Sequence, residues 1–336
     1  MLGKERVMKI FNHEKPDRMP CFCVNGTPTY EQMEKVGAFW PEGHERAQDM
    51  AKLAIAAYTV LGFDAVRAPF CQTFEAEALG CKVKLGGKEN IPGIDHPTLY
   101  KLDDKPVLPD DFLKRGRIPQ LIEAIRIMKR EVGDKVAVIG GIIGPFTIAG
   151  AMLDAVPILK ASFKTPDKLR PFLDVAEKAG TMLGQALVDA GADMIVVEDM
   201  QASPDLIAPH TYRDLELEYQ KKQVEALSVP VILHICGNVD KIISFMHETG
   251  CAGISLEPKS DTKLARKIVG ANVVLIGGVD AATTLFMKGP DDVKDASREQ
   301  IEMGLDVLAP GCAIAPGTPT ANLLAMVEVA KEFTYL

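Results

Sequence analysis

Three residues in the last third of the chain have the types and spacing of metal ligands. His234 and Cys236 stand two residues apart in the string PVILHICGN, and Cys312 follows Pro310 and Gly311 in DVLAPGC. One imidazole and two thiolates form a ligand set that suits Zn²⁺, and three protein ligands leave a fourth position open for a substrate. The pattern predicts a catalytic zinc site, with cysteines that merely pack in the core as the structural alternative.

Strands must bring these ligands together. The run PVILHIC reads as a buried strand, in which residues i and i+2 project from the same face, so His234 and Cys236 point the same way. Cys312 follows another apolar run, and the carboxyl ends of parallel strands are where barrel enzymes build their sites. A nucleophilic Cys–His pair, the main functional rival, fits less well because neither residue is presented at a helix N-terminus.

A repeating unit runs through the chain: an amphipathic helix, a Gly or short polar break, then a nearly continuous apolar run. Such runs are typical of parallel strands covered by helices. Eight of them alternate with helices: MPCFCV, FDAVRA, VAVIGG, DMIVVE, PVILHIC, AGISLE, VVLIGG and DVLAP. We expect residues 1–336 to form a single α/β domain, a (β/α)₈ TIM barrel with an N-terminal helical extension. A doubly wound open sheet is disfavoured because no GxGxxG follows the first strand.

One segment interrupts this rhythm, between the second and third expected strands. From Cys71 to about Gly116 the chain is polar and rich in Pro and Gly, as in KLGGKENIPGIDHP. An excursion of this length predicts a hairpin that covers or shapes the active site at one mouth of the barrel. A second small domain is the alternative interpretation.

Composition narrows the class of protein. The chain has 336 residues, 47% hydrophobic content and a net charge of −8, which argues against nucleic-acid binding. The N-terminus lacks the pattern of a signal peptide, and the apolar runs are too short for membrane insertion. Seven irregularly spaced cysteines suggest reduced thiols. We therefore expect a cytoplasmic protein.

The chain also resembles a known family. His–x–Cys followed by a distant Cys is similar to the zinc-binding pattern of methylcobamide:coenzyme M methyltransferases from methylotrophic methanogens. The opening KERVMKIFNHEKPDRMP resembles the wider uroporphyrinogen decarboxylase superfamily, and HICGN, GISLE and PGCAIAPGTP continue the likeness along essentially the whole chain. The resemblance implies a barrel, a bound Zn²⁺, coenzyme M as acceptor thiol, and a methylated corrinoid protein as partner and methyl donor, in methanogenesis from methylated C1 compounds.

The decarboxylase branch fits less well. Those enzymes carry paired arginines after their first strand that bind porphyrinogen carboxylates, whereas PCFCVNGTPTYEQM contains no Arg. Two further functions stay open. One is that of a related corrinoid:thiol methyltransferase with a different acceptor, and the second is that of a corrinoid- or metal-binding protein without turnover.

The ligand set also suits thiol alkylation. Zn²⁺ binds a thiolate and lowers the pKa of the thiol. Two cysteine thiolates already neutralise the charge of the metal. A third thiolate, from the substrate, therefore leaves the complex negative, and the substrate sulfur stays nucleophilic.

A carboxylate is the candidate for the open position. Glu257 ends the sixth expected strand in GISLEPK, one strand along from His234, and the resemblance points the same way. We expect it to act as an exchangeable fourth ligand and catalytic residue. The alternative is a Glu that orients another ligand or pairs with Lys259.

The remaining candidates concern the substrate. Glu198, Asp199 and Gln201 follow the fourth expected strand and are predicted to orient His234 or contact substrate, with helix capping as the alternative. The sulfonate of coenzyme M needs hydrogen-bond donors. The candidates are the Asn25 side chain and the backbone of Gly277, Gly278 and Gly317.

Overall fold

A parallel sheet forms the centre of the computed structural model, which describes residues 1–26, 28–95 and 98–335. The seven strands lie in the order β1-β4-β5-β6-β7-β8-β9, with every neighbouring pair parallel. Their bounds are β1 Ala65–Ala68, β4 Ala137–Ile143, β5 Met194–Glu198, β6 Val231–His234, β7 Gly253–Leu256, β8 Val274–Val279 and β9 Val307–Pro310.

The expected first strand, MPCFCV, is only partly realised. Cys21 forms an isolated parallel bridge to Leu308 of β9, and the amide of Asp64 next to β1 donates to Cys21 O at 2.9 Å. Residues 19–24 therefore occupy the gap between the two edge strands and close the sheet into a barrel. The predicted TIM-barrel class is confirmed, with seven regular strands and this eighth, irregular segment in the described part of the chain.

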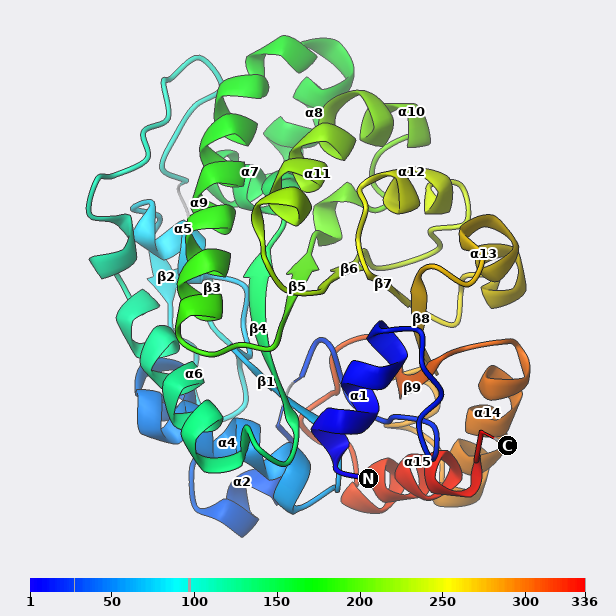
Figure 1. Cartoon of the computed structure of the whole chain (residues 1–336). Coiled ribbons are helices and arrows are strands. Elements are labelled where there is room, and N and C mark those ends of the chain that lie inside the picture. Colours follow the sequence, from blue (N-terminus) through cyan, green and yellow to red (C-terminus); the bar gives the residue numbers. More distant parts are fainter. Residues whose placement is uncertain (27, 96–97, 336) are drawn as a thin grey trace.

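Helices surround this sheet, as Figure 1 shows. They bury regularly spaced apolar residues; in α6, for example, Leu121, Ile125 and Met128 are fully buried. The α-helices are α1 Gly3–Phe11, α2 Tyr30–Val36, α3 Glu42–Glu45, α4 Ala47–Thr59, α5 Phe74–Ala78, α6 Ile118–Val132, α7 Pro145–Leu153, α8 Ala155–Lys164, α9 Arg170–Asp189, α10 Pro209–Thr211, α11 Leu217–Ala226, α12 Ile243–Glu248, α13 Thr262–Val269, α14 Pro290–Glu302 and α15 Thr320–Glu332. Shorter helical turns are η1 Phe112–Lys114, η2 Pro166–Lys168, η3 Met200–Ala202 and η4 Tyr212–Glu216, of which η4 is a π-turn.

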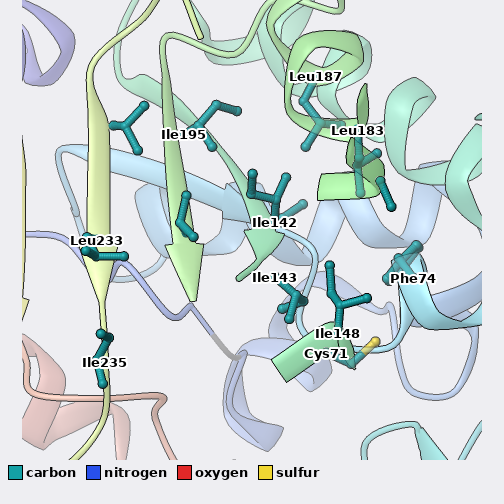
Figure 2. Close-up of a cluster of buried hydrophobic side chains, with 14 of the residues drawn as sticks. Cys71, Phe74, Ile142, Ile143, Ile148, Leu183, Leu187, Ile195, Leu233 and Ile235 are labelled. Carbon is teal, nitrogen blue, oxygen red and sulfur yellow. The ribbon is translucent and has the colours of Figure 1, made fainter. Parts of the chain in front are cut away.

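The outer face of the sheet packs against helices. In Figure 2, Ile142 of β4 and Ile195 of β5 lie on the side of the sheet that faces Leu183 and Leu187 of α9, and Leu233 of β6 belongs to the same buried cluster. All five side chains are fully buried. This apolar layer fixes where β5 and β6 end, and therefore where the side chains beyond their ends lie.

The inner face changes character along the barrel. Apolar residues that are fully buried fill its middle: Ile139, Val196, Ile232, Ile276 and Val307. Further along β5 and β6 the inward side chains become polar, because alternation places Glu198 and His234 on the same face as Val196 and Ile232. The interior of the barrel is thus apolar in the middle and polar at its carboxyl end.

The N-terminal helix closes the opposite end. Lys4 of α1 bonds through its amide to Lys135 O just before β4, and its Nζ lies 2.8 Å from Asp193, which precedes β5. Helix α1 therefore lies across the amino ends of these strands, in front of the barrel in Figure 1. The expected helical extension is confirmed.

The excursion after β1 has structure of its own. It contains α5 and an antiparallel pair, β2 (Val83–Lys84) with β3 (Gly93–Ile94), so the predicted hairpin is confirmed. Between this hairpin and α7 lies a cavity of about 280 Å³, whose lining includes Gln72, Thr147 and Gln201. These residues follow β1, β4 and β5, so the excursion borders the carboxyl end of the barrel.

Among the described helices, none is by itself long and apolar enough to span a membrane. Helices α7 and α8 are long and apolar enough only when they are taken together, and the pair is bent by 115°.

Candidate metal centre at the barrel mouth

The three predicted ligands come together at the carboxyl end of the barrel. His234 is the last residue of β6, and Cys236 follows it on the same side before Gly237 turns the chain with φ 86°. Cys312 comes just after β9. Gly311 allows the Cys312 loop to approach Pro258 closely, because a Cβ at position 311 would lie 2.6 Å from Pro258 Cδ.

Their ligand atoms have the separations of a four-coordinate metal site. The Sγ atoms of Cys236 and Cys312 lie 3.8 Å apart, and His234 Nε2 lies 3.4 Å and 3.8 Å from them. Ligand bonds of ordinary length around a tetrahedral Zn²⁺ give S···S and N···S edges of about 3.8 and about 3.6 Å. A Glu257 carboxylate oxygen completes a group whose ligand atoms all lie within 4.8 Å of one another. The residues therefore fit a zinc ion.

Glu257 holds this position through two contacts. Its Oε1 accepts a hydrogen bond from the amide of Gly237 at 2.9 Å, and its Oε2 lies 3.9 Å from Lys259 Nζ. Gly237 is the residue after Cys236, so the carboxylate is tied to the ligand loop itself. Glu257 therefore lies beside both the cluster and Lys259, and its role as an exchangeable fourth ligand stays a prediction.

The pKa values of the two cysteine thiols differ. A hydrogen bond from Cys236 lowers the pKa of Cys312 to about 4, and the same bond raises the pKa of Cys236. Burial alone would lower the pKa of His234, but the hydrogen bond to Cys312 and the negative charges of Cys312, Glu198 and Glu257 together raise that pKa. Because the second thiolate is disfavoured beside the first, a cation is needed before both can be thiolates.

The orientation of His234 has a partner that the sequence analysis missed. Ser255 Oγ lies 3.0 Å from His234 Nδ1, and both residues are fully buried. The expectation that Glu198, Asp199 or Gln201 orients His234 is therefore wrong. The signal for Ser255 was present in GISLE, where it stands two residues before Glu257 and shares its face of the strand.

Asp199 is occupied by the scaffold. Its carboxylate accepts bonds from the amide and hydroxyl of Thr147 at 2.9 and 2.7 Å, and from Gln220 Nε2 at 3.0 Å. Thr147 lies in the first turn of α7, so Asp199 caps that helix. It is fully buried, which supports the capping alternative over substrate contact.

The other predicted substrate residues lie around the mouth. Glu198 is buried and bonded to Arg67 and Gln72, while Gln201 lines the cavity beneath the β2–β3 hairpin. Asn25 is buried at the end of the segment that completes the barrel. Their roles toward a substrate stay predictions. Arg67 was missed because its strand, FDAVRA, reads as an ordinary buried run.

Comparison with known proteins places the chain. The uroporphyrinogen decarboxylase (URO-D) family matches residues 2–333. Methylcobamide:CoM methyltransferase MtaA of Methanosarcina barkeri is 40% identical over 98% of both chains, and MtbA of Methanosarcina acetivorans is 38% identical over 99% of this chain and 98% of its own. A uroporphyrinogen decarboxylase of Nicotiana tabacum is 26% identical over 67% of this chain and 60% of its own.

Solved structures agree. A methyltransferase from Methanosarcina mazei superimposes with a TM-score of 0.94 at 38% identity over 99% of both chains. A B12-independent methionine synthase from Shewanella, 15% identical over 94% of this chain and 97% of its own, has a TM-score of 0.61 and shares the fold. The chain belongs to the uroporphyrinogen decarboxylase family. Within that family it is an enzyme of the methylcobamide:coenzyme M methyltransferase type, as the sequence analysis predicted.

Proposed function

We propose that this enzyme transfers a methyl group from a methylated corrinoid protein to the thiol of coenzyme M, with a Zn²⁺ held by His234, Cys236 and Cys312. The observation that carries the proposal is the cluster of these three side chains with Glu257, whose ligand atoms lie within 4.8 Å of one another. The relatives named methylcobamide:CoM methyltransferases, which match nearly the whole chain, support the choice of donor and acceptor.

The reaction forms one bond and breaks another. A bound Zn²⁺ supplies the thiolate, because a thiol that ligates the metal has a strongly lowered pKa. The thiolate sulfur attacks the methyl carbon of methyl-Co(III). The new C–S bond makes a thioether, the Co–C bond breaks, and its electron pair stays on cobalt as Co(I). The thiol proton passes to solvent.

The protein's own groups prepare this step. His234, held by Ser255, and the two cysteines provide three ligands on a rigid barrel end. Glu257 occupies the fourth side of the cluster while it accepts the Gly237 amide bond. We propose that its carboxylate would be the exchangeable fourth ligand of the metal, and that Lys259, 3.9 Å away, would pair with this carboxylate when a thiol takes its place.

The test uses the purified full-length chain. We expect about one zinc per chain. We also expect methyl transfer from free methylcobalamin to coenzyme M, which the loss of the methyl-cobalt absorption band measures. Cys312→Ser and Cys236→Ser should lose both zinc and transfer. Cys81→Ser is the matched control, because Cys81 is a buried thiol in the excursion, where it donates to Ala151 O.

The remaining outcomes decide between the candidate functions. Zinc binding without transfer to any thiol would support a non-catalytic binding protein, and transfer to another thiol only would overturn the acceptor. A relative that is 30% identical over 90% of this chain is named methylated-thiol–coenzyme M methyltransferase. A methylated thiol is therefore the second methyl donor to assay. Zinc and activity that both survive in Cys312→Ser would contradict the proposed centre.

A further inference from the structure

Exposed apolar side chains gather at one end of the barrel. In the described part of the chain, ten of the sixteen exposed large hydrophobic side chains lie between the carboxyl end of a strand and the helix that returns to the next strand. These ten are Tyr30, Phe39, Ile91, Leu99, Val107, Val156, Phe163, Leu206, Phe286 and Met287. The connections into the amino ends of β1 and β4 to β9, all of which are described, carry none of the sixteen. Single exposed apolar residues are ordinary, but their concentration around the mouth indicates an interaction surface.

The two most exposed of these side chains stand on either side of the metal cluster. Phe163 of α8 is 79% exposed, and Met287 in the loop after β8 is 71% exposed. The cluster residues come at or just after the ends of β6, β7 and β9. In the sheet, β4, which leads to α7 and α8, lies two strands before β6, and β8 lies between β7 and β9. A body that rests on both side chains therefore covers the cluster.

Helix α8 has two apolar faces. Ile158 and Ala161 are buried against the rest of the domain. Val156 and Phe163 are both exposed and lie seven residues apart, which is two helical turns, so they form a second apolar stripe toward solvent. Figure 1 shows α8 beyond the arrowheads of β4 and β5. The second stripe therefore lies at the mouth and is not covered by the chain itself.

Lysines border these apolar side chains. Lys160 and Lys164 are exposed on α8, and neither forms an ion pair within the described residues. Lys288, also exposed, follows Met287 directly. Interfaces commonly have an apolar centre and a polar border, and opposite charges face each other across that border. The surface therefore fits a partner whose contact face is apolar and surrounded by carboxylates.

We propose that Val156, Phe163 and Met287 form the docking surface for the protein that carries the methyl donor, a corrinoid protein with an apolar, acid-bordered contact face. This inference rests on the proposed function, in which the methyl group arrives on a second protein. The cobalt must come within bonding reach of the cluster, so its carrier must lie on the segments around the mouth. The carrier also leaves after each transfer, which fits a small interface held by a few apolar side chains.

A second copy of this chain and a membrane surface are the other bodies that cover exposed apolar side chains. Both are disfavoured by the position of Phe163 and Met287 on opposite sides of the cluster. Either body would close the mouth from which the thiol and the methyl group must enter. A carrier that delivers the methyl group closes the mouth only for the transfer itself.

The experiment compares two methyl donors, with coenzyme M as the acceptor. Free methylcobalamin needs no docking surface, whereas a protein-bound donor does. The protein donor is the methylated corrinoid protein of Methanosarcina barkeri, the source of a 40% identical relative, that gives the highest kcat/KM with the wild type. Phe163→Glu and Met287→Glu should each lower kcat/KM for the protein donor roughly 10- to 100-fold. The value for methylcobalamin should stay within about twofold, because both side chains are at the surface.

Ile268→Glu is the matched control. Ile268 is an exposed apolar side chain in the last turn of α13, which leads to the amino end of β8, away from the mouth. This variant should use both donors as the wild type does. Lys160→Glu/Lys164→Glu should impair the protein donor most at low ionic strength, since salt screens charges across an interface. Equal donor ratios in Phe163→Glu, Met287→Glu and Ile268→Glu would contradict the proposal.

Calorimetry with the same corrinoid protein separates this proposal from the proposed function. Binding that Phe163→Glu weakens, without methyl transfer from either donor, would support the docking surface and overturn the function. Transfer from both donors that the two mouth variants leave unchanged would overturn the docking surface alone. A wild type that accepts methyl only from free methylcobalamin would overturn both the protein donor and its docking surface.

Sedimentation and flotation on phosphatidylglycerol vesicles test the other two occupants. We expect the wild type and Phe163→Glu to have the same oligomeric state and neither to float. Self-association or flotation that Phe163→Glu abolishes, with an unchanged donor ratio, would assign the surface to a second copy or to a membrane and refute the proposal.

Discussion

Ser255 and His234 are register partners on neighbouring strands, and Ser255 Oγ lies 3.0 Å from His234 Nδ1. Because the two side chains point into the barrel from adjacent strands, the hydroxyl fixes the imidazole ring with Nε2 toward Cys236 and Cys312. A ligand held by an outer hydrogen bond needs no reorientation when the metal binds.

Replacement of Ser255 by Ala should therefore weaken zinc binding about 10- to 100-fold without abolishing it, the usual effect of losing such a partner. Competition with a zinc chelator measures the affinity. Ser297→Ala is the control, because Ser297 is also fully buried but bonds within α14, to Val293 O. Unchanged zinc affinity in Ser255→Ala would show that packing alone orients the imidazole.

Asp199→Asn tests a different role. The carboxylate caps α7 through Thr147, so the variant should lose about 1–2 kcal/mol of unfolding free energy, and its zinc content should not change. Urea unfolding and metal analysis of one preparation measure both quantities. A variant of normal stability with a raised KM for coenzyme M would instead favour the substrate contact predicted from the sequence.

Gly311→Ala probes the approach of the Cys312 loop to Glu257. The added Cβ would lie 2.6 Å from Pro258 Cδ and 3.3 Å from Glu257 Cα, so the loop must shift away from the other ligands. We expect weaker zinc binding and a loss of about 1–3 kcal/mol in stability. Gly87→Ala, where the Cβ meets nothing within 4 Å, should change neither. Equal zinc affinities in the two variants would mean that the loop yields without cost.

Glu75 predicts a pH dependence of stability. Burial raises the pKa of its carboxyl from 4.5 to about 7, so the folded protein holds this proton more tightly than the unfolded chain. Its contribution is fully present below about pH 4.5 and is lost as pH rises toward 7. Glu75→Gln should therefore gain up to about 3 kcal/mol relative to wild type at pH 8, and little at pH 4.5.

Denaturant unfolding at a series of pH values between about 4.5 and 8 checks this expectation. The control is Glu89→Gln, because Glu89 is exposed. The stability of this variant should depend on pH as that of the wild type does. A Glu75→Gln profile parallel to that of wild type would show that the carboxyl titrates at its ordinary value.

Much of the fold was readable from the sequence because buried parallel strands appear in it as apolar runs. The same alternation that buries Val196 and Ile232 turns Glu198 and His234 toward the mouth, so the ligand positions followed from strand geometry. The first expected strand forms only a single bridge, at Cys21. Whether a segment forms a regular ladder of hydrogen bonds depends on the strands next to it in the sheet. That information is absent from the local sequence.

The supporting residues were harder to predict. Ser255 and Arg67 act through partners on other strands, and the register that pairs them is set by the closure of the whole barrel. Asp199 has the residue type of a substrate contact, but its role as a cap depends on where α7 begins. Residue type and spacing thus predicted which residues form the cluster, while the groups that orient them required the tertiary structure.

The most direct test of the central claim is X-ray absorption at the zinc edge, with and without coenzyme M. The proposed centre predicts two sulfur ligands in the resting enzyme, from Cys236 and Cys312, with His234 and Glu257 supplying the nitrogen and oxygen. Addition of coenzyme M should raise the sulfur count to three and remove the oxygen. A resting site without two sulfurs, or a count that coenzyme M leaves unchanged, would contradict the account.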